Sequence, residues 1–88
     1  MYTLEVREGV DRLFFKLAKK DQKQMMIVEK KIEQILVNPY HFKPLRAPMQ
    51  HLRRTHVGSF VLVYSIDEEK KVVTIEDYAH HDEVYQLR

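Results

Sequence analysis

The spacing of apolar residues changes along the chain, and each spacing predicts one kind of secondary structure. Residues 2–6 (YTLEV) alternate in polarity and contain β-formers, which predicts a first strand. Gly9 is expected to end this strand. Residues 10–20 repeat apolar side chains at the spacing of one helical face, which predicts an amphipathic helix. The residues of this face are Val10, Leu13, Phe14, Leu17 and Ala18.

A second helix is predicted after Asp21, because Asp21 and Gln24 have the spacing of a capping box. Asn38 and Pro39 are expected to end it, since proline cannot continue a helix. The two helices are separated by about two residues and should form an antiparallel hairpin, whose apolar faces need a further layer to cover them. The face of the second helix is Met25, Val28, Ile32, Ile35 and Leu36.

Residues 38–48 hold all three prolines and are predicted to form a structured loop. Residues 51–57, 60–66 and 72–78 follow as strand-like segments joined by turns too short for a parallel crossover, which predicts an antiparallel meander. The predicted fold is a single α+β domain over residues 1–88. It consists of an N-terminal strand, an antiparallel helical hairpin, an antiparallel three-stranded meander covered on one face by the hairpin, and a short C-terminal helix or tail.

Both faces of the segment 60–66 are apolar in sequence. Leu62 and Tyr64 point to one face, while Val61 and Val63 point to the other. The helical hairpin can cover only one of these faces. A partner protein or the C-terminal tail helix is expected to cover the other, because small monomers rarely expose large apolar patches.

The composition is that of a folded globular protein, with 44% hydrophobic and 32% charged residues. No cysteine is present, which excludes disulfides, thiolate catalysis and cysteine-bound zinc. Only two glycines occur, and neither belongs to a phosphate-binding glycine loop, which excludes NTP hydrolysis of that kind. The start MYTLEVREGV lacks the features of a signal peptide and no apolar run is long enough for a membrane span, so we expect a cytoplasmic protein without a membrane partner.

Charge is distributed unevenly, although the formal net charge is only +2. No Asp or Glu lies between Glu33 and Asp67, and this stretch should carry a positive field. It is either an acid-free loop and hairpin without special function or a surface that faces the phosphates of a nucleic acid. The second interpretation predicts RNA binding by Lys43, Arg46, His51 and Arg53.

The same stretch and the C-terminal tail hold candidates for acid–base chemistry on RNA. Cleavage of a phosphodiester needs a base for the 2′-hydroxyl, an acid for the leaving oxygen and cations for the phosphorane. Histidine can serve in either proton role at neutral pH. The candidates are Arg54 and His56, which share one strand face, and His80, His81 and Tyr85 in the tail. Alternatively, a tail histidine caps a helix and Tyr85 packs on the sheet.

A metal site at the adjacent His80 and His81 is not predicted. Neighbouring residues on an extended chain point to opposite sides, and no HExxH or comparable spacing is present. We therefore expect neither a metal nor a small-molecule cofactor.

The phrases KPLRAPMQHLRRTHVGSFVLVYSIDEEKKVVTIEDY and HHDEVY, in this order, resemble the RelE/ParE family of bacterial and archaeal toxins over nearly the whole chain. The family pattern is a strand, a helical hairpin, a KPL loop, a basic strand, a glycine–aromatic strand that ends in tyrosine, an acidic turn and a terminal HR-x-x-VY. The order and spacing of these parts carry the resemblance.

The resemblance implies a ribosome-dependent endoribonuclease that cleaves mRNA in the ribosomal A site and is neutralised by an acidic, RelB-like antitoxin. It implies that Arg54 occupies a basic-strand position, that His80 is the histidine of the HR pair and that Tyr85 is the terminal tyrosine. Val61 and His81 stand where the family pattern commonly carries arginines. The alternatives are therefore a ParE-like toxin that binds DNA gyrase and an inactive binding protein that keeps the fold.

Overall fold

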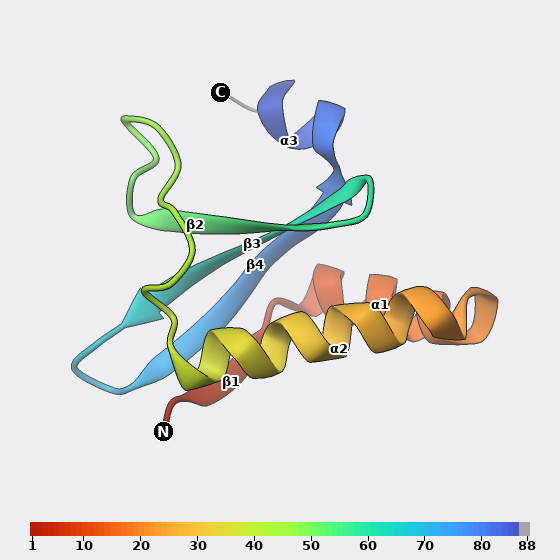
Figure 1. Cartoon of the computed structure of the whole chain (residues 1–88), viewed down its shortest axis with the longest axis horizontal. Coiled ribbons are helices and arrows are strands. Elements are labelled where there is room, and N and C mark those ends of the chain that lie inside the picture. The colour runs from red at the N-terminus through yellow and green to blue at the C-terminus, as the bar shows by residue number, and fades with distance from the viewer. Residues whose placement is uncertain (87–88) are drawn as a thin grey trace.

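The computed structural model describes residues 1–86, and its α+β architecture confirms the order of elements predicted from the sequence (Figure 1). An N-terminal strand leads into two helices, and three further strands precede a short C-terminal helix. None of the described helices is both long and apolar enough to cross a membrane. The elements are β1 (Thr3–Val6), α1 (Glu8–Lys20), α2 (Gln22–Val37), β2 (Leu52–Val57), β3 (Phe60–Asp67), β4 (Val72–His80) and α3 (His81–Gln86).

The strands form one mixed sheet in the order β1-β4-β3-β2. β2, β3 and β4 pair antiparallel, as the predicted meander requires. β1 pairs parallel with β4, from Thr3 opposite Val72 to Val6 opposite Ile75, a pairing that the sequence pattern did not predict. The first and the last strand of the chain are therefore neighbours in the sheet.

The start of α1 differs from the prediction, because the helix begins at Glu8 and contains Gly9. Gly9 therefore does not end β1. The preceding residue, Arg7, has an extended backbone (φ −57°, ψ 143°), which leaves the turn from strand to helix very short. Glu8 and Asp11 lie in the first turn, where negative side chains interact favourably with the helix dipole.

The predicted cap of α2 is confirmed in part. Asp21 Oδ1 accepts a hydrogen bond from the backbone N–H of Gln24 at 3.1 Å. The Gln24 side chain does not return to Asp21 as in a full capping box. Instead its amide nitrogen donates to the carbonyl oxygen of Val57 at 3.1 Å and to the hydroxyl of Tyr78 at 3.0 Å. The start of α2 is thereby tied to β2 and β4.

α1 and α2 lie against one face of the sheet, and the main hydrophobic core fills the space between them (Figure 1). The predicted face of α2 is confirmed, because its members are buried or partly buried. On α1 the prediction was too wide, since Leu13 is 44% exposed and Ala18 is exposed. The buried core residues are Val10, Phe14, Val28, Ile32, Ile35, Val57, Leu62, Tyr64, Val73, Ile75 and Tyr78.

The opposite face of the sheet, here called the distal face, is covered in part by the chain itself. The loop between α2 and β2 rises on this side, as does α3, which contacts β3 and β4 (Figure 1). Val61 and Val63 are buried in a small second cluster with Leu45 of the loop, Leu52 and Ala79. The sequence left open whether a partner protein or the C-terminal helix covers this face. For these two valines a partner protein is not needed, because residues of the loop, β2 and β4 pack on them.

Candidate functional site

Arg54 and His56 extend from β2 on the distal face. Directly opposite residues of antiparallel strands share a face, and Arg54 lies opposite Val63 while His56 lies opposite Val61. The rows continue into β4, where Asp77 follows Val63 and Ala79 follows Val61. The prediction that Arg54 and His56 share one face is therefore confirmed.

Arg53 points to the other face and holds the loop in place. Its guanidinium donates to the carbonyl oxygens of Phe42 at 2.6 Å and Tyr40 at 3.4 Å, and it lies 5.1 Å from the centre of the Tyr40 ring. These contacts occupy the side chain within the protein. RNA binding by Arg53 stays a prediction, and the structure shows a structural role for this residue.

A pocket of about 390 Å³ lies between α2, the loop and the edge strand β2. Among the described residues, five basic side chains and no acidic one line it, so it is suited to an anion. Lys31 was missed by the sequence reasoning, because it lies on α2, outside the acid-free stretch. The lining residues are Lys31, His41, Phe42, Lys43, Arg54, Thr55 and His56.

The other predicted RNA-binding residues lie in or next to the loop. Lys43 lines the basic pocket, and its carbonyl oxygen accepts the backbone N–H of Arg54 at 3.2 Å. Arg46 and His51 are exposed and do not line this pocket. The loop therefore adds two exposed basic residues outside the pocket as well as two, His41 and Lys43, within its lining.

Acidic residues of the distal face lie on β4. This strand is separated from the basic strand β2 by β3. A bulge between Val63 and Tyr64 of β3 leaves Glu76 without a direct partner residue. Glu76 accepts hydrogen bonds from Ser65 Oγ at 2.5 Å and from Arg7 Nε at 2.8 Å. Burial raises the pKa of Glu76, but these two bonds and the Arg7 charge outweigh it, so the net change lowers this pKa.

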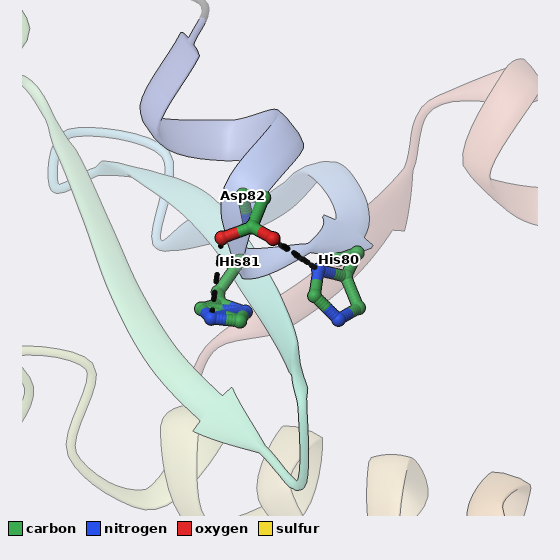
Figure 2. Close-up of side chains that lie close together, drawn as sticks. All are labelled: His80, His81 and Asp82. Carbon is green, nitrogen blue, oxygen red and sulfur yellow. Dashed lines mark hydrogen bonds and ion pairs between the residues drawn. The ribbon is translucent and has the colours of Figure 1, made fainter.

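His80, His81 and Asp82 form a cluster where β4 ends and α3 begins (Figure 2). The two rings lie on the same side, with centroids 4.4 Å apart, because the chain is no longer extended after His80. This arrangement contradicts the expectation that adjacent histidines point to opposite sides. The Asp82 carboxylate lies between the rings, 3.7 Å from His80 Nδ1 and 3.3 Å from His81 Nε2.

Contacts with the end of the β2–β3 hairpin hold this cluster in place. The backbone N–H of His81 donates to the carbonyl oxygen of Ser59 at 3.1 Å. The His80 ring lies edge-on to Phe60, whose ring stacks on Tyr78 at 5.0 Å. Asp82 is a component that the sequence reasoning missed, although its position directly after the two histidines was a usable signal.

The fold brings His56 and the histidine cluster to the same end of the sheet. His56, Val61 and Ala79 form one row across three strands, and Ala79 directly precedes His80. Two strand spacings separate the backbones of His56 and Ala79 by about 10 Å. The side chain of Tyr85 lies outside the described part of the structure, so its predicted role is not tested.

Comparison with protein families gives one match over almost the whole chain. Residues 1–85 match the family described as ParE toxin of type II toxin-antitoxin system, parDE. A protein of Methanosarcina mazei is 54% identical over 86 residues, which cover 97% of this chain and 100% of that protein. The protein of Methanocaldococcus jannaschii named "Putative toxin RelE4" is 41% identical over 89 residues, covering 100% of this chain and 95% of that protein.

A solved structure shares the fold. It is the toxin-antitoxin complex RelBE2 from Mycobacterium tuberculosis, in which the matching chain is 26% identical with a TM-score of 0.74. The match covers 91% of this chain and 98% of that chain. The strand, helical hairpin and meander predicted from the sequence therefore agree with the architecture of a chain in an experimentally determined toxin-antitoxin complex.

Proposed function

Because this chain belongs to the family of ParE toxins of type II toxin-antitoxin systems, we propose that it is a toxin that cleaves mRNA on the ribosome and so inhibits translation. The cleavage uses acid–base chemistry of the protein's own side chains. The cytoplasm is the compartment in which such a toxin meets its target. An antitoxin neutralises the toxin until the toxin is released from their complex.

The observation that carries this proposal is the basic pocket, whose lining includes Arg54 and His56. Its described lining contains five basic residues and no carboxylate, as binding of an RNA phosphate requires. The acids of the distal face, Glu76 and Asp77, lie on β4 and so are separated from the pocket by β3. A bound RNA backbone would therefore follow β2 and the loop, with Arg46 at its side. His51 lies nearer to the acids, since its charge helps to lower the pKa of Glu76.

Cleavage needs two proton transfers at one phosphodiester. One histidine takes the proton of the 2′-hydroxyl, whose oxygen attacks the phosphorus and forms a cyclic phosphate, while a second histidine protonates the 5′-oxygen as it leaves. His56, His80 and His81 are the candidates for these roles, with Tyr85 as a further candidate. Arg54 stabilises the negative charge that develops on the phosphorane.

An antitoxin is the proposed protein partner. The solved relative from Mycobacterium tuberculosis is a toxin-antitoxin complex. An acidic antitoxin would be attracted to the acid-free stretch, which speeds association. Exposed apolar side chains on α1 and α2, including Phe15 (66% exposed) and Met26 (59% exposed), offer a surface for an amphipathic helix.

Binding to DNA gyrase is the second candidate function. It is favoured by the family description, which names ParE toxins, and by the buried Val61, which provides no cation at a position where the RelE/ParE pattern commonly has one. A gyrase-binding toxin would stop growth without cutting mRNA, so the state of the mRNA distinguishes the two candidates.

Induction of the chain in a bacterial host, followed by mapping of mRNA 5′ ends, tests the nuclease. We expect cuts at ribosome-occupied codons, which disappear when His80 and His81 are both replaced by alanine. Arg54→Ala should lower the cleavage rate at least about 10²-fold, as loss of one transition-state donor does.

Arg12→Ala is the matched control, because Arg12 is exposed on α1 and pairs only with Glu8 among the described contacts. It should cleave like the wild type. Growth arrest with intact mRNA would overturn the nuclease and support a gyrase target, whereas no arrest would support an inactive binding protein.

A further inference from the structure

The cluster of His80, His81 and Asp82 has the donor set of a transition-metal site. One ring nitrogen from each histidine and one carboxylate oxygen lie within 4.8 Å of one another. Two imidazoles and one carboxylate suit Zn²⁺ among the common divalent ions, and three protein ligands leave a fourth position for water. The side chains are 38%, 43% and 71% exposed, so an ion can enter from solvent.

The spacing of the donor atoms fits a tetrahedral ion. Zinc binds nitrogen and oxygen at about 2.0–2.2 Å, which places neighbouring ligand atoms about 3.3–3.6 Å apart. His81 Nε2 lies 3.3 Å from Asp82 Oδ1, and His80 Nδ1 lies 3.7 Å from Asp82 Oδ2. The two distances run to different oxygens of the carboxylate, so side-chain rotation has to bring one nitrogen from each ring and one oxygen, now within 4.8 Å of one another, to these spacings.

The contacts of His80 bring one of its ring nitrogens and a carboxylate oxygen close together. His80 Nδ1 accepts the backbone N–H of Asp82, in the first turn of α3, at 3.3 Å. It nevertheless faces Asp82 Oδ2, which is an acceptor as well. A cation between these two atoms would have one nitrogen and one oxygen donor, and it would compete with the N–H of Asp82 for the ring nitrogen.

We propose that His80, His81 and Asp82 bind one Zn²⁺ ion at the junction of β4 and α3. His81 Nδ1 is buried without a hydrogen-bond partner among the described residues, so the site should bind zinc about 10–100-fold more weakly than a site with outer-shell support. The bound ion occupies the imidazole lone pairs that proton transfer needs. Resting on the proposed nuclease, the consequence is that zinc inhibits cleavage.

Isothermal titration of the full chain with ZnCl₂ tests the site without relying on activity. The expected result is one ion per chain with a micromolar dissociation constant. His81→Ala and Asp82→Asn should each weaken binding at least roughly 10-fold, since loss of an outer-shell partner alone costs about 10–100-fold. Asp82→Asn keeps the shape of the side chain, so it separates loss of a ligand from loss of fold, which circular dichroism monitors.

His41→Ala is the matched control for zinc binding alone, because His41 lines the basic pocket and does not belong to the cluster of His80, His81 and Asp82. It should bind zinc like the wild type. Equal binding by the wild type, His81→Ala and Asp82→Asn, or loss of binding in His41→Ala, would overturn the site. Absence of micromolar binding by the wild type would overturn it as well.

A cleavage assay with and without ZnCl₂ separates this site from the proposed nuclease. Calorimetric binding together with zinc-inhibited cleavage supports both. Zinc binding without any cleavage overturns the nuclease and keeps the zinc site. Cleavage without zinc binding keeps the nuclease and overturns the zinc site. Binding that leaves cleavage unchanged overturns the inhibition.

Discussion

Val61 lies in β3 at a position where the RelE/ParE pattern commonly carries an arginine, and its side chain is fully buried. It packs with Val63 in the small cluster on the distal face. A long cation cannot occupy this place without displacing its neighbours. In the proposed nuclease, phosphate stabilisation therefore falls to side chains around the basic pocket, namely Arg54, Lys43 and Lys31.

Tyr64 carries a buried hydroxyl that determines how the loop leaves α2. This hydroxyl donates to the carbonyl oxygen of Pro39 at 2.6 Å, and burial raises the pKa of Tyr64 to about 12 despite the nearby charge of Arg53. Tyr64→Phe leaves the Pro39 carbonyl without its donor and should lower the free energy of unfolding by about 1–3 kcal/mol. Urea denaturation measures this change.

Tyr40→Phe is the control for that experiment, because Tyr40 is exposed and water can replace its hydrogen bond to Glu68. Tyr40→Phe should lose less stability than Tyr64→Phe, although it removes one of the hydrogen bonds to Glu68. Equal losses in the two variants would contradict the assigned role of the Tyr64 hydroxyl.

At the scale of elements, local patterns in the sequence were sufficient to predict the helices and the meander. The period of apolar residues and the Asp21 cap depend on residues close in sequence. The structure confirms both helices and the hydrogen bond to Asp21, although the predicted face of α1 was too wide and the capping box is incomplete. The parallel pairing of β1 with β4 joins residues about seventy positions apart in sequence, and no local signal encodes it. The bulge at Glu76 has no local signal either, because it depends on register.

The candidate site was predictable only where it depends on local patterns in the sequence. The shared face of Arg54 and His56 follows from strand alternation alone. Lys31 joins them only because α2 packs beside β2, and Asp82 joins the histidines only because α3 begins at His81. These two placements depend on packing and on the exact end of a strand.

The two glycines, one in a helix and one in a turn, should respond oppositely to alanine. Gly9 lies in α1 with no atom within 4 Å of an added Cβ, so Gly9→Ala should raise the free energy of unfolding by about 0.5–1 kcal/mol. Gly58, between β2 and β3, has φ +65°, so Gly58→Ala should lower it by about 1 kcal/mol. Thermal unfolding of both variants measures the changes, and a gain in Gly58→Ala would contradict the turn geometry.

At the scale of the whole molecule, Glu68 connects three distant segments. Its Oε1 accepts the hydroxyls of Tyr2 at 2.7 Å and Tyr40 at 2.6 Å, and its Oε2 pairs with Lys71. These residues come from the start of the chain, the loop after α2 and the turn between β3 and β4. Hydrogen bonds from Lys71, Tyr40 and Tyr2 lower the pKa of Glu68 to about 2.

This lowered pKa predicts a defined pH dependence. A carboxylate whose pKa is depressed on folding stabilises the protein above its unfolded value of 4.5, and this stabilisation is lost as the pH falls towards about 2. Glu68→Gln should therefore lower the Tm at pH 7, and the difference from the wild type should shrink between pH 4.5 and pH 2. Thermal unfolding across this range measures it, with Glu69→Gln as control; a difference that does not depend on pH would contradict the prediction.

The position of β4 between β1 and β3 also determines when during synthesis this protein can acquire its fold. A ribosome makes the chain from the N-terminus, so β1 and the helical hairpin emerge long before residues 72–80, which complete the sheet that they pack on. His80 and His81 are made at the end of that strand. A nascent chain therefore has neither its central strand nor its proposed site, and we expect that it cannot attack the ribosome that is still producing it.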